Sequence, residues 1–169
     1  AGEAVAPATA EATGGETQKT LADLPPPAAL PPEEAAQVAV SVGGKTLTRG
    51  EIAADANAIL SMNAKMIPAE QAEEARKAVS RRLAGQFVEK TILLNHAAEL
   101  GIEITDEDVA KAKEELLKGF EGMEENPPKT FEEFAEKLPF PLERVEADFR
   151  DEVIARKLIG KLREDAEAA

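Results

Sequence analysis

Residues 69–100 have the sequence AEQAEEARKAVSRRLAGQFVEKTILLNHAAEL, which contains no proline and a single glycine. Pro68 precedes this stretch and Gly101 follows it, and these are positions at which proline starts a helix and glycine ends one. Apolar residues recur in it at three- and four-residue steps, as at Leu83 and Phe87. We therefore predict one helix of roughly 45 Å, a spine along which the other elements lie.

Before this helix, the sequence predicts a hairpin and a first helix. Residues 38–47 read VAVSVGGKTL, in which valines alternate with small residues before a Gly43-Gly44 turn and a short return strand. An isolated hairpin is only marginally stable in water, so it must dock on another element. Thr48 and Glu51 then match a capping box, which predicts a helix that ends near Lys65.

After the long helix, the signals predict three more helices. Thr105 and Thr130 each precede acidic residues in a pattern typical of a helix N-terminus. Pro139-Phe140-Pro141 interrupts the chain before the last helical pattern begins. The predicted helices span about residues 106–120, 131–137 and 142 onward. The fold class predicted is therefore mainly α, with about five helices around one long spine helix and a small N-terminal β-hairpin.

The first 37 residues differ in composition from the rest. They hold six of the eleven prolines, among alanine, threonine and acidic residues. Such a segment buries too little apolar surface to offset the entropy of ordering it. We expect a disordered Pro/Ala-rich acidic tail over residues 1–37 and one helical domain over residues 38–165.

Overall composition narrows the classes of partner and chemistry. Twenty basic and 33 acidic residues give a net charge of -13, which disfavours binding to nucleic acid and to anionic membrane surfaces. No apolar run is long enough for membrane insertion. The chain has no cysteine, so disulfides and cysteine-ligated metals are excluded.

The order of these signals resembles the N-terminal domain of the SurA/PrsA-type extracytoplasmic chaperones, which are parvulin-associated proteins. That domain opens with V-x-V-x-G-x-x-I/L-T-x-x-E/D, and residues 40–51 read VSVGGKTLTRGE. Further phrases that resemble the family lie at residues 82–102, 104–109, 130–134 and 150–162, so the resemblance covers about residues 38–163. It implies a fold like the SurA N-terminal and trigger-factor C-terminal domains.

The resemblance also implies a function. Such a domain would be an ATP-independent holdase without a cofactor, which binds unfolded or partly folded outer-membrane or secreted proteins through an apolar groove. Its location would be periplasmic, with any signal peptide already removed. The family's parvulin domain has no counterpart here, so we expect no catalysis by this chain, although the parent protein would be a peptidyl-prolyl isomerase.

Two alternatives come from the residues themselves. The hinges at Ile67-Pro68 and at 126–128 would suit a dimerisation or scaffold module, possibly a domain-swapped homodimer. A carboxylate enzyme is the least favoured alternative. Helix caps and solvated faces explain the acidic pairs, and His96 lacks a second histidine or a cysteine with which to bind a metal. We therefore predict neither catalytic residues nor a metal site.

Methionine and phenylalanine at the ends of elements can form an adaptable surface for apolar peptides, or can fill a core where helices cross. The candidate peptide-binding residues are Met62, Met66, Ile67, Phe120, Met123, Phe131, Phe134 and Phe140. Within the long helix, we expect residues 83–98 to form the core with the last helix and the hairpin. The N-terminal half, rich in Ala, Glu and Arg, is expected to extend outward and line the client groove or a dimer contact.

Overall fold

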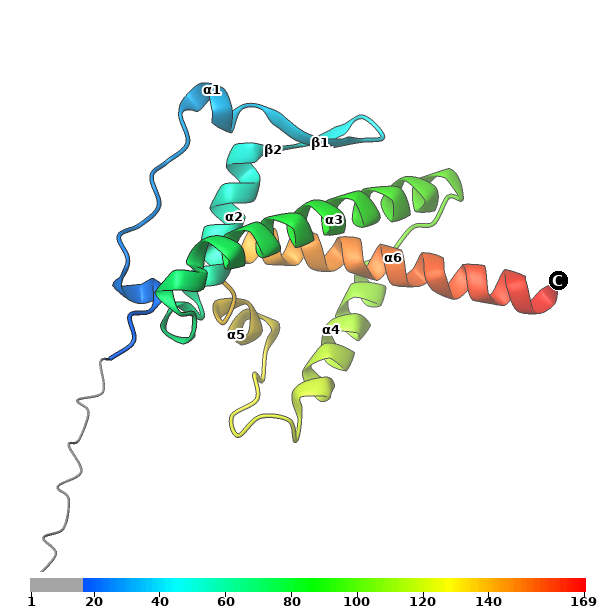
Figure 1. Ribbon diagram of the computed structural model, residues 1–169. Coiled ribbons are helices and arrows are strands. Elements are labelled where there is room, and N and C mark those ends of the chain that lie inside the picture. The colour runs from blue at the N-terminus through cyan, green and yellow to red at the C-terminus, as the bar shows by residue number, and fades with distance from the viewer. Residues whose placement is uncertain (1–16) are drawn as a thin grey trace, which may run out of the picture.

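The computed structural model describes residues 17–169 (Figure 1). Strands β1 (Val38–Val42) and β2 (Lys45–Thr48) form an antiparallel hairpin, with a bulge between Val38 and Val40. Gly43 and Gly44 have φ angles of 54° and 81°, the left-handed values that a two-residue hairpin turn needs at both positions. The predicted hairpin is thus confirmed.

Helix α2 (Arg49–Ser61) begins directly after β2. The Thr48 hydroxyl accepts the backbone N–H of Glu51 at 3.2 Å, and the Glu51 carboxylate accepts the N–H of Thr48 at 2.8 Å. This is the predicted capping box. Two 3-10 turns, η2 (Ala64–Met66) and η3 (Ala69–Gln71), then lead into the long helix.

The long helix α3 (Ala72–Glu99) and the last helix α6 (Leu142–Ala168) pack side by side and form the frame of the fold (Figure 1). Both run in the same direction, so the intervening chain must return to the start of α6. Helices α4 (Asp106–Phe120) and α5 (Phe131–Glu136) make that return on one side of the pair, while the hairpin lies on the other side. A mainly helical fold with a small hairpin is therefore confirmed.

The core lies where α4, α5 and α6 meet. Its buried cluster contains Val109, Ala112, Phe131, Ala135, Val145, Phe149 and Val153. Within the described chain this cluster includes no residue of α3, which contributes separately through Ala72, Thr91 and Ala97. Residues 83–98 pack against α6 and the hairpin as expected, and two of them, Thr91 and Ala97, are buried, but the main buried cluster lies between α4, α5 and α6. Short side chains at Thr91 and Ala97 let α3 approach its neighbours closely, whereas most of its larger apolar residues are half-buried and Ile92 is exposed.

Residues 17–37 differ from the predicted disordered tail, whose first 16 residues lie outside the described part of the chain. They contain η1 (Leu21–Asp23) and the short helix α1 (Pro32–Ala35). The Leu21 N–H donates to the Ile67 carbonyl at 2.8 Å, and the Ala69 N–H donates to the Lys19 carbonyl at 2.9 Å. This pairing uses backbone N–H and C=O groups, and the proline content of the segment does not predict such hydrogen bonds. The domain boundary at residue 38 stays a prediction.

Among residues 17–169, none of the helices combines the length and the apolar character that crossing a bilayer requires.

Candidate functional site

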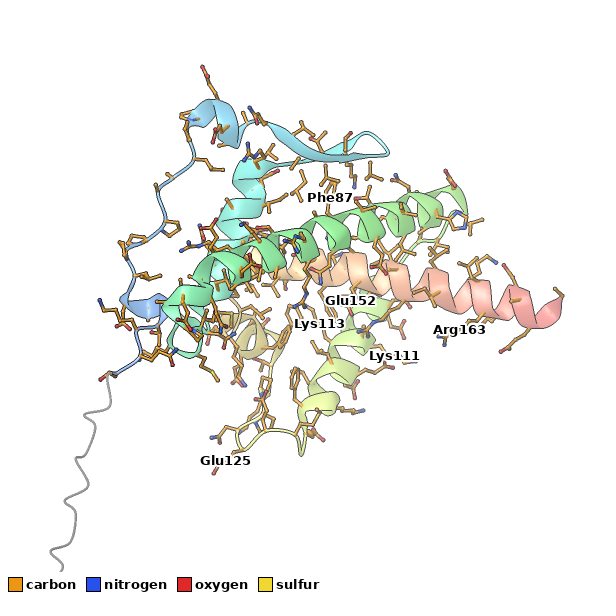
Figure 2. The ribbon with its side chains drawn as sticks, in the orientation of Figure 1. Phe87, Lys111, Lys113, Glu125, Glu152 and Arg163 are labelled. Atoms are coloured by element: carbon orange, nitrogen blue, oxygen red, sulfur yellow. The ribbon has the colours of Figure 1, made fainter. Side chains whose placement is uncertain are left out.

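A groove of about 560 Å³ lies between the hairpin and α2 on one side and α3 and α6 on the other. Its apolar lining comes from four places in the chain: β2, α2, α3 and the turn before α6. The principal apolar residues are Leu47, Ile52, Ile59, Leu83, Phe87 and Phe140, and each of them is half-buried. Phe87 lies on the side of α3 that faces the hairpin (Figure 2).

Helical spacing explains why these side chains meet. Ile52 and Ile59 are seven residues apart on α2, so they share one face, and Leu83 and Phe87 are one turn apart on α3. Phe140 lies in the break before α6, next to the N-cap residue Pro141, and lines the groove from there. Apolar residues that are distant in sequence therefore line one open surface.

Arg144 lines the groove and forms an ion pair that joins α6 to α2. Its Nη1 donates to Oδ1 of Asp55 at 2.7 Å, and Nη2 also donates to the same carboxylate. The guanidinium carbon lies 4.1 Å from the centre of the Phe140 ring, a cation–π contact. The hydrogen bonds to Asp55 raise the pKa of Arg144 despite its partial burial, so the cation stays charged.

Lys90 forms a second pair, between α3 and α6. Its Nζ lies 3.0 Å from Oδ1 of Asp148 and 2.8 Å from Oδ2 of Asp151. Burial disfavours the charged ammonium, but the hydrogen bonds to Asp151 and Asp148 outweigh this effect and raise the pKa of Lys90. Both cations of the groove are thus bound to carboxylates of the protein.

Of the candidate residues predicted from the sequence, Phe140 is the one found among the groove-lining side chains. Phe131 is only 4% exposed and lies in the core, where its ring centre is 5.0 Å from that of Phe149. Phe134 packs against the same core, and Phe120 contacts Phe134 with ring centres 5.7 Å apart. These three phenylalanines therefore serve packing between α4, α5 and α6.

The remaining candidates lie in two parts of the chain, with Met62, Met66 and Ile67 around η2 and Met123 in the loop after α4. Met66 and Met123 are 82% and 80% exposed, and Met62 is also exposed, but Met123 lies in the loop after α4, far along the chain from the other two. Ile67 is half-buried, and its carbonyl accepts the N–H of Leu21. The structure does not bring the eight candidates together into one surface.

Sequence reasoning missed most of the groove. Leu83 and Phe87 belong to the apolar stripe identified on the long helix, and Ile52 and Ile59 to the apolar face of the first helix. Periodicity shows that these residues share a face, but it does not show whether a neighbouring element covers that face. The half-buried state of all six could be found only from the packing.

Helix capping and surface contacts account for the acidic residues and for His96. Thr105 and Asp108 form the predicted cap of α4, with the Thr105 N–H donating to Asp108 at 2.9 Å. At α5, a capping box would have Glu133 accept the backbone N–H of Thr130. Glu133 instead accepts the N–H of the preceding residue, Lys129, at 2.7 Å. His96 is exposed, with Nδ1 3.4 Å from Oε2 of Glu99. Within residues 17–169 there is no cluster of three potential metal ligands from His, Cys, Asp and Glu.

Comparison with known proteins gives one family. The family model described as the SurA-like N-terminal domain matches residues 31–159, which is most of the chain and includes α1, the hairpin and helices α2 to α5. No curated protein and no solved structure matches the chain. The matched range contains every groove residue named above, and the order of hairpin and helices agrees with the family resemblance of the sequence. The chain therefore belongs to the SurA-like N-terminal domain family.

Proposed function

We propose that this chain is an ATP-independent holdase that binds unfolded or partly folded polypeptides in the groove between the hairpin, α2, α3 and α6. The clients would be outer-membrane or secreted proteins, and the location would be the periplasm. The observation that carries this proposal is that half-buried apolar side chains from separate elements line a single open groove. Membership of the SurA-like family supports it.

The size of the groove suits a short segment of client. A volume of about 560 Å³ falls within the roughly 300–1,000 Å³ that ligand sites commonly occupy. That space admits a few side chains of an unfolded chain and not a folded domain. An apolar side chain that leaves water contributes about 1.5–3 kcal/mol, so several of them can offset the cost of association.

The affinity expected is moderate. Micromolar binding corresponds to about 8 kcal/mol, and apolar contacts without a fixed pattern of hydrogen bonds give little sequence preference. Release can then occur without ATP, because a moderate affinity permits fast dissociation. Met62, Met66 and Met123 would provide further exposed apolar contacts outside the groove for longer clients.

Suppression of aggregation tests the proposal. A denatured outer-membrane protein is diluted into buffer with the chain at slight molar excess, and light scattering is followed. The proposal expects clear suppression by the chain and none by an unrelated acidic protein of similar charge. Unchanged scattering at tens of micromolar would exclude the holdase function.

A dimerisation or scaffold module is the second candidate, and exposed apolar residues near the C-terminal ends of α3 and α6 favour it. Leu100, at the end of α3, and Ile159 and Leu162, on α6, are all exposed large apolar residues. Leu100 also lines a shallow notch with Lys157, Gly160 and Lys161 of α6. Sedimentation equilibrium distinguishes the two functions, because a scaffold predicts a stable dimer that does not bind unfolded clients.

A further inference from the structure

We propose that the groove selects apolar segments that also carry a lysine or arginine, so that cationic clients bind in preference to neutral or acidic ones. This inference rests on the proposed function, since it names the class of client that the same groove takes. Its basis is the distribution of charge around the groove, which is independent of the apolar lining.

Carboxylates outnumber cations along the groove. Among the groove-lining residues that the structure describes, the cations are Lys90 and Arg144. The carboxylates are Asp55, Glu89, Asp148, Asp151 and Glu152. With apolar walls close by, such an excess of one sign produces a stronger field than the same charges on an open surface. The local potential therefore attracts a cationic side chain.

Both cations that line the groove are already paired with carboxylates of the protein. Arg144 is held by Asp55 and stacks on Phe140, while Lys90 is held by Asp148 and Asp151. An acidic client would have to break one of these pairs or enter beside unneutralised carboxylates. Either event costs free energy, and a cationic client avoids that cost.

Two carboxylates are available to a client. Glu89 on α3 has no ion pair within the described chain, and its residue is exposed. Glu152 on α6 pairs with Arg156 one turn further along the same helix, an exposed arrangement that contributes little and is easily exchanged. Glu152 lies on the stretch of α6 beside α3 (Figure 2), so the two acids come from adjacent helices.

The geometry thus combines an apolar cavity with acidic groups at its border. A client residue such as phenylalanine or leucine would enter among Leu83, Phe87 and Ile59, and a neighbouring lysine or arginine would reach Glu89 or Glu152. Long cationic side chains suit this role, because their methylene stems cover apolar surface while the charged end reaches the rim.

Peptide binding measures the preference directly. Three labelled peptides share one apolar core and differ only at two flanking positions, which are arginine, glutamine or glutamate. Fluorescence anisotropy with the full chain gives their Kd values at low and high salt. We expect the arginine peptide to bind about three- to tenfold more tightly than the glutamine peptide, with the glutamate peptide weakest. The preference shrinks as salt rises.

A double variant and a matched control distinguish the effect of the charges at the groove from the effect of the net charge of the protein. Glu89→Gln with Glu152→Gln removes two acids at the groove, and Glu73→Gln with Glu114→Gln removes two exposed acids elsewhere, each of which pairs with a lysine one turn away. The groove variant should lose most of the arginine preference, while the control keeps it. Equal loss in both variants would overturn the inference in favour of net charge.

The outcomes also distinguish this inference from the proposed function. If all three peptides bind with the same Kd, the holdase function stands and the charge preference is wrong. If none of the peptides binds and aggregation of a denatured client is not suppressed, the proposed function itself is wrong.

Discussion

Arg144 and Asp55 are 89 residues apart in sequence, and their side chains join the start of α6 to α2 through two hydrogen bonds. Both residues line the groove, so the pair joins two of its walls. Arg144 also holds Phe140 in place, because its guanidinium lies over that ring. An ion pair as well as apolar packing therefore connects the elements that line the groove.

Removing this pair should weaken the fold modestly. We expect Asp55→Asn to lower the free energy of unfolding by about 1 kcal/mol, since Arg144 is partly exposed and water screens the interaction. A double-mutant cycle with Arg144→Gln, measured by urea denaturation, should give a positive coupling energy of similar size. Additive effects of the two substitutions would show that the pair contributes nothing.

The cap of α4 should make the free energy of unfolding depend on pH in the acid range. Hydrogen bonding from the Thr105 backbone N–H, and secondly from Lys157, holds the pKa of Asp108 below its ordinary value of 3.8. Because the folded pKa is depressed, this carboxylate stabilises the fold above pH 3.8, and the contribution is lost as pH falls through the folded value. The stability difference between wild type and Asp108→Asn should therefore narrow in acid. Urea denaturation at pH 7 and pH 3 measures it.

The neighbouring substitution Glu107→Gln serves as the control, because Glu107 is exposed and does not cap the helix within the described structure. A pH-independent difference for Asp108→Asn would contradict the role of the cap.

Phe131 should behave as a core residue. Phe131→Ala removes a buried ring that packs on Phe149 and lies under the ammonium of Lys113, 4.3 Å from the ring centre. Substitutions of this kind cost about 3–5 kcal/mol. Met123→Ala, at an exposed position, should change stability by less than about 0.5 kcal/mol. Thermal or urea unfolding distinguishes the two, and a mild effect at Phe131 would argue that its ring is accessible.

The pairing of residues 19–21 with residues 67–69 should be visible in hydrogen exchange. The N–H groups of Leu21 and Ala69 donate to backbone carbonyls, whereas the proline-rich residues 25–31 lie mostly exposed and outside any helix or strand. We expect slower exchange at Leu21 and Ala69 than at Ala28 and Ala29. Deleting residues 1–24 should speed the exchange of Ala69 several-fold. Unprotected amides at both positions would show that this segment is not docked in solution.

Much of the fold could be predicted because its signals are local. Capping boxes at Thr48 and Thr105 and the glycine turn of the hairpin place element boundaries within one or two residues of those observed. The backbone hydrogen bonds between residues 19–21 and 67–69 have no such signal, since they involve no characteristic side chain.

The groove was less accessible to prediction. Phe131 is the first residue of α5 and Phe140 follows the end of that helix, yet one ring is buried in the core and the other lines the groove. Which environment each ring enters depends on how α4 and α5 fold back against α6, a long-range feature that local patterns do not encode.

The most direct test of the groove as the client site compares two substitutions on one helix. Phe87 lines the groove, whereas Ile92 is 55% exposed and lies outside it. After circular dichroism shows that Phe87→Gln and Ile92→Gln both remain folded, the Kd of each for an unfolded outer-membrane protein is measured. Loss of the aromatic contact between Phe87 and the client predicts at least about tenfold weaker binding for Phe87→Gln and an unchanged Kd for Ile92→Gln. Equal affinities for the two variants would contradict the account.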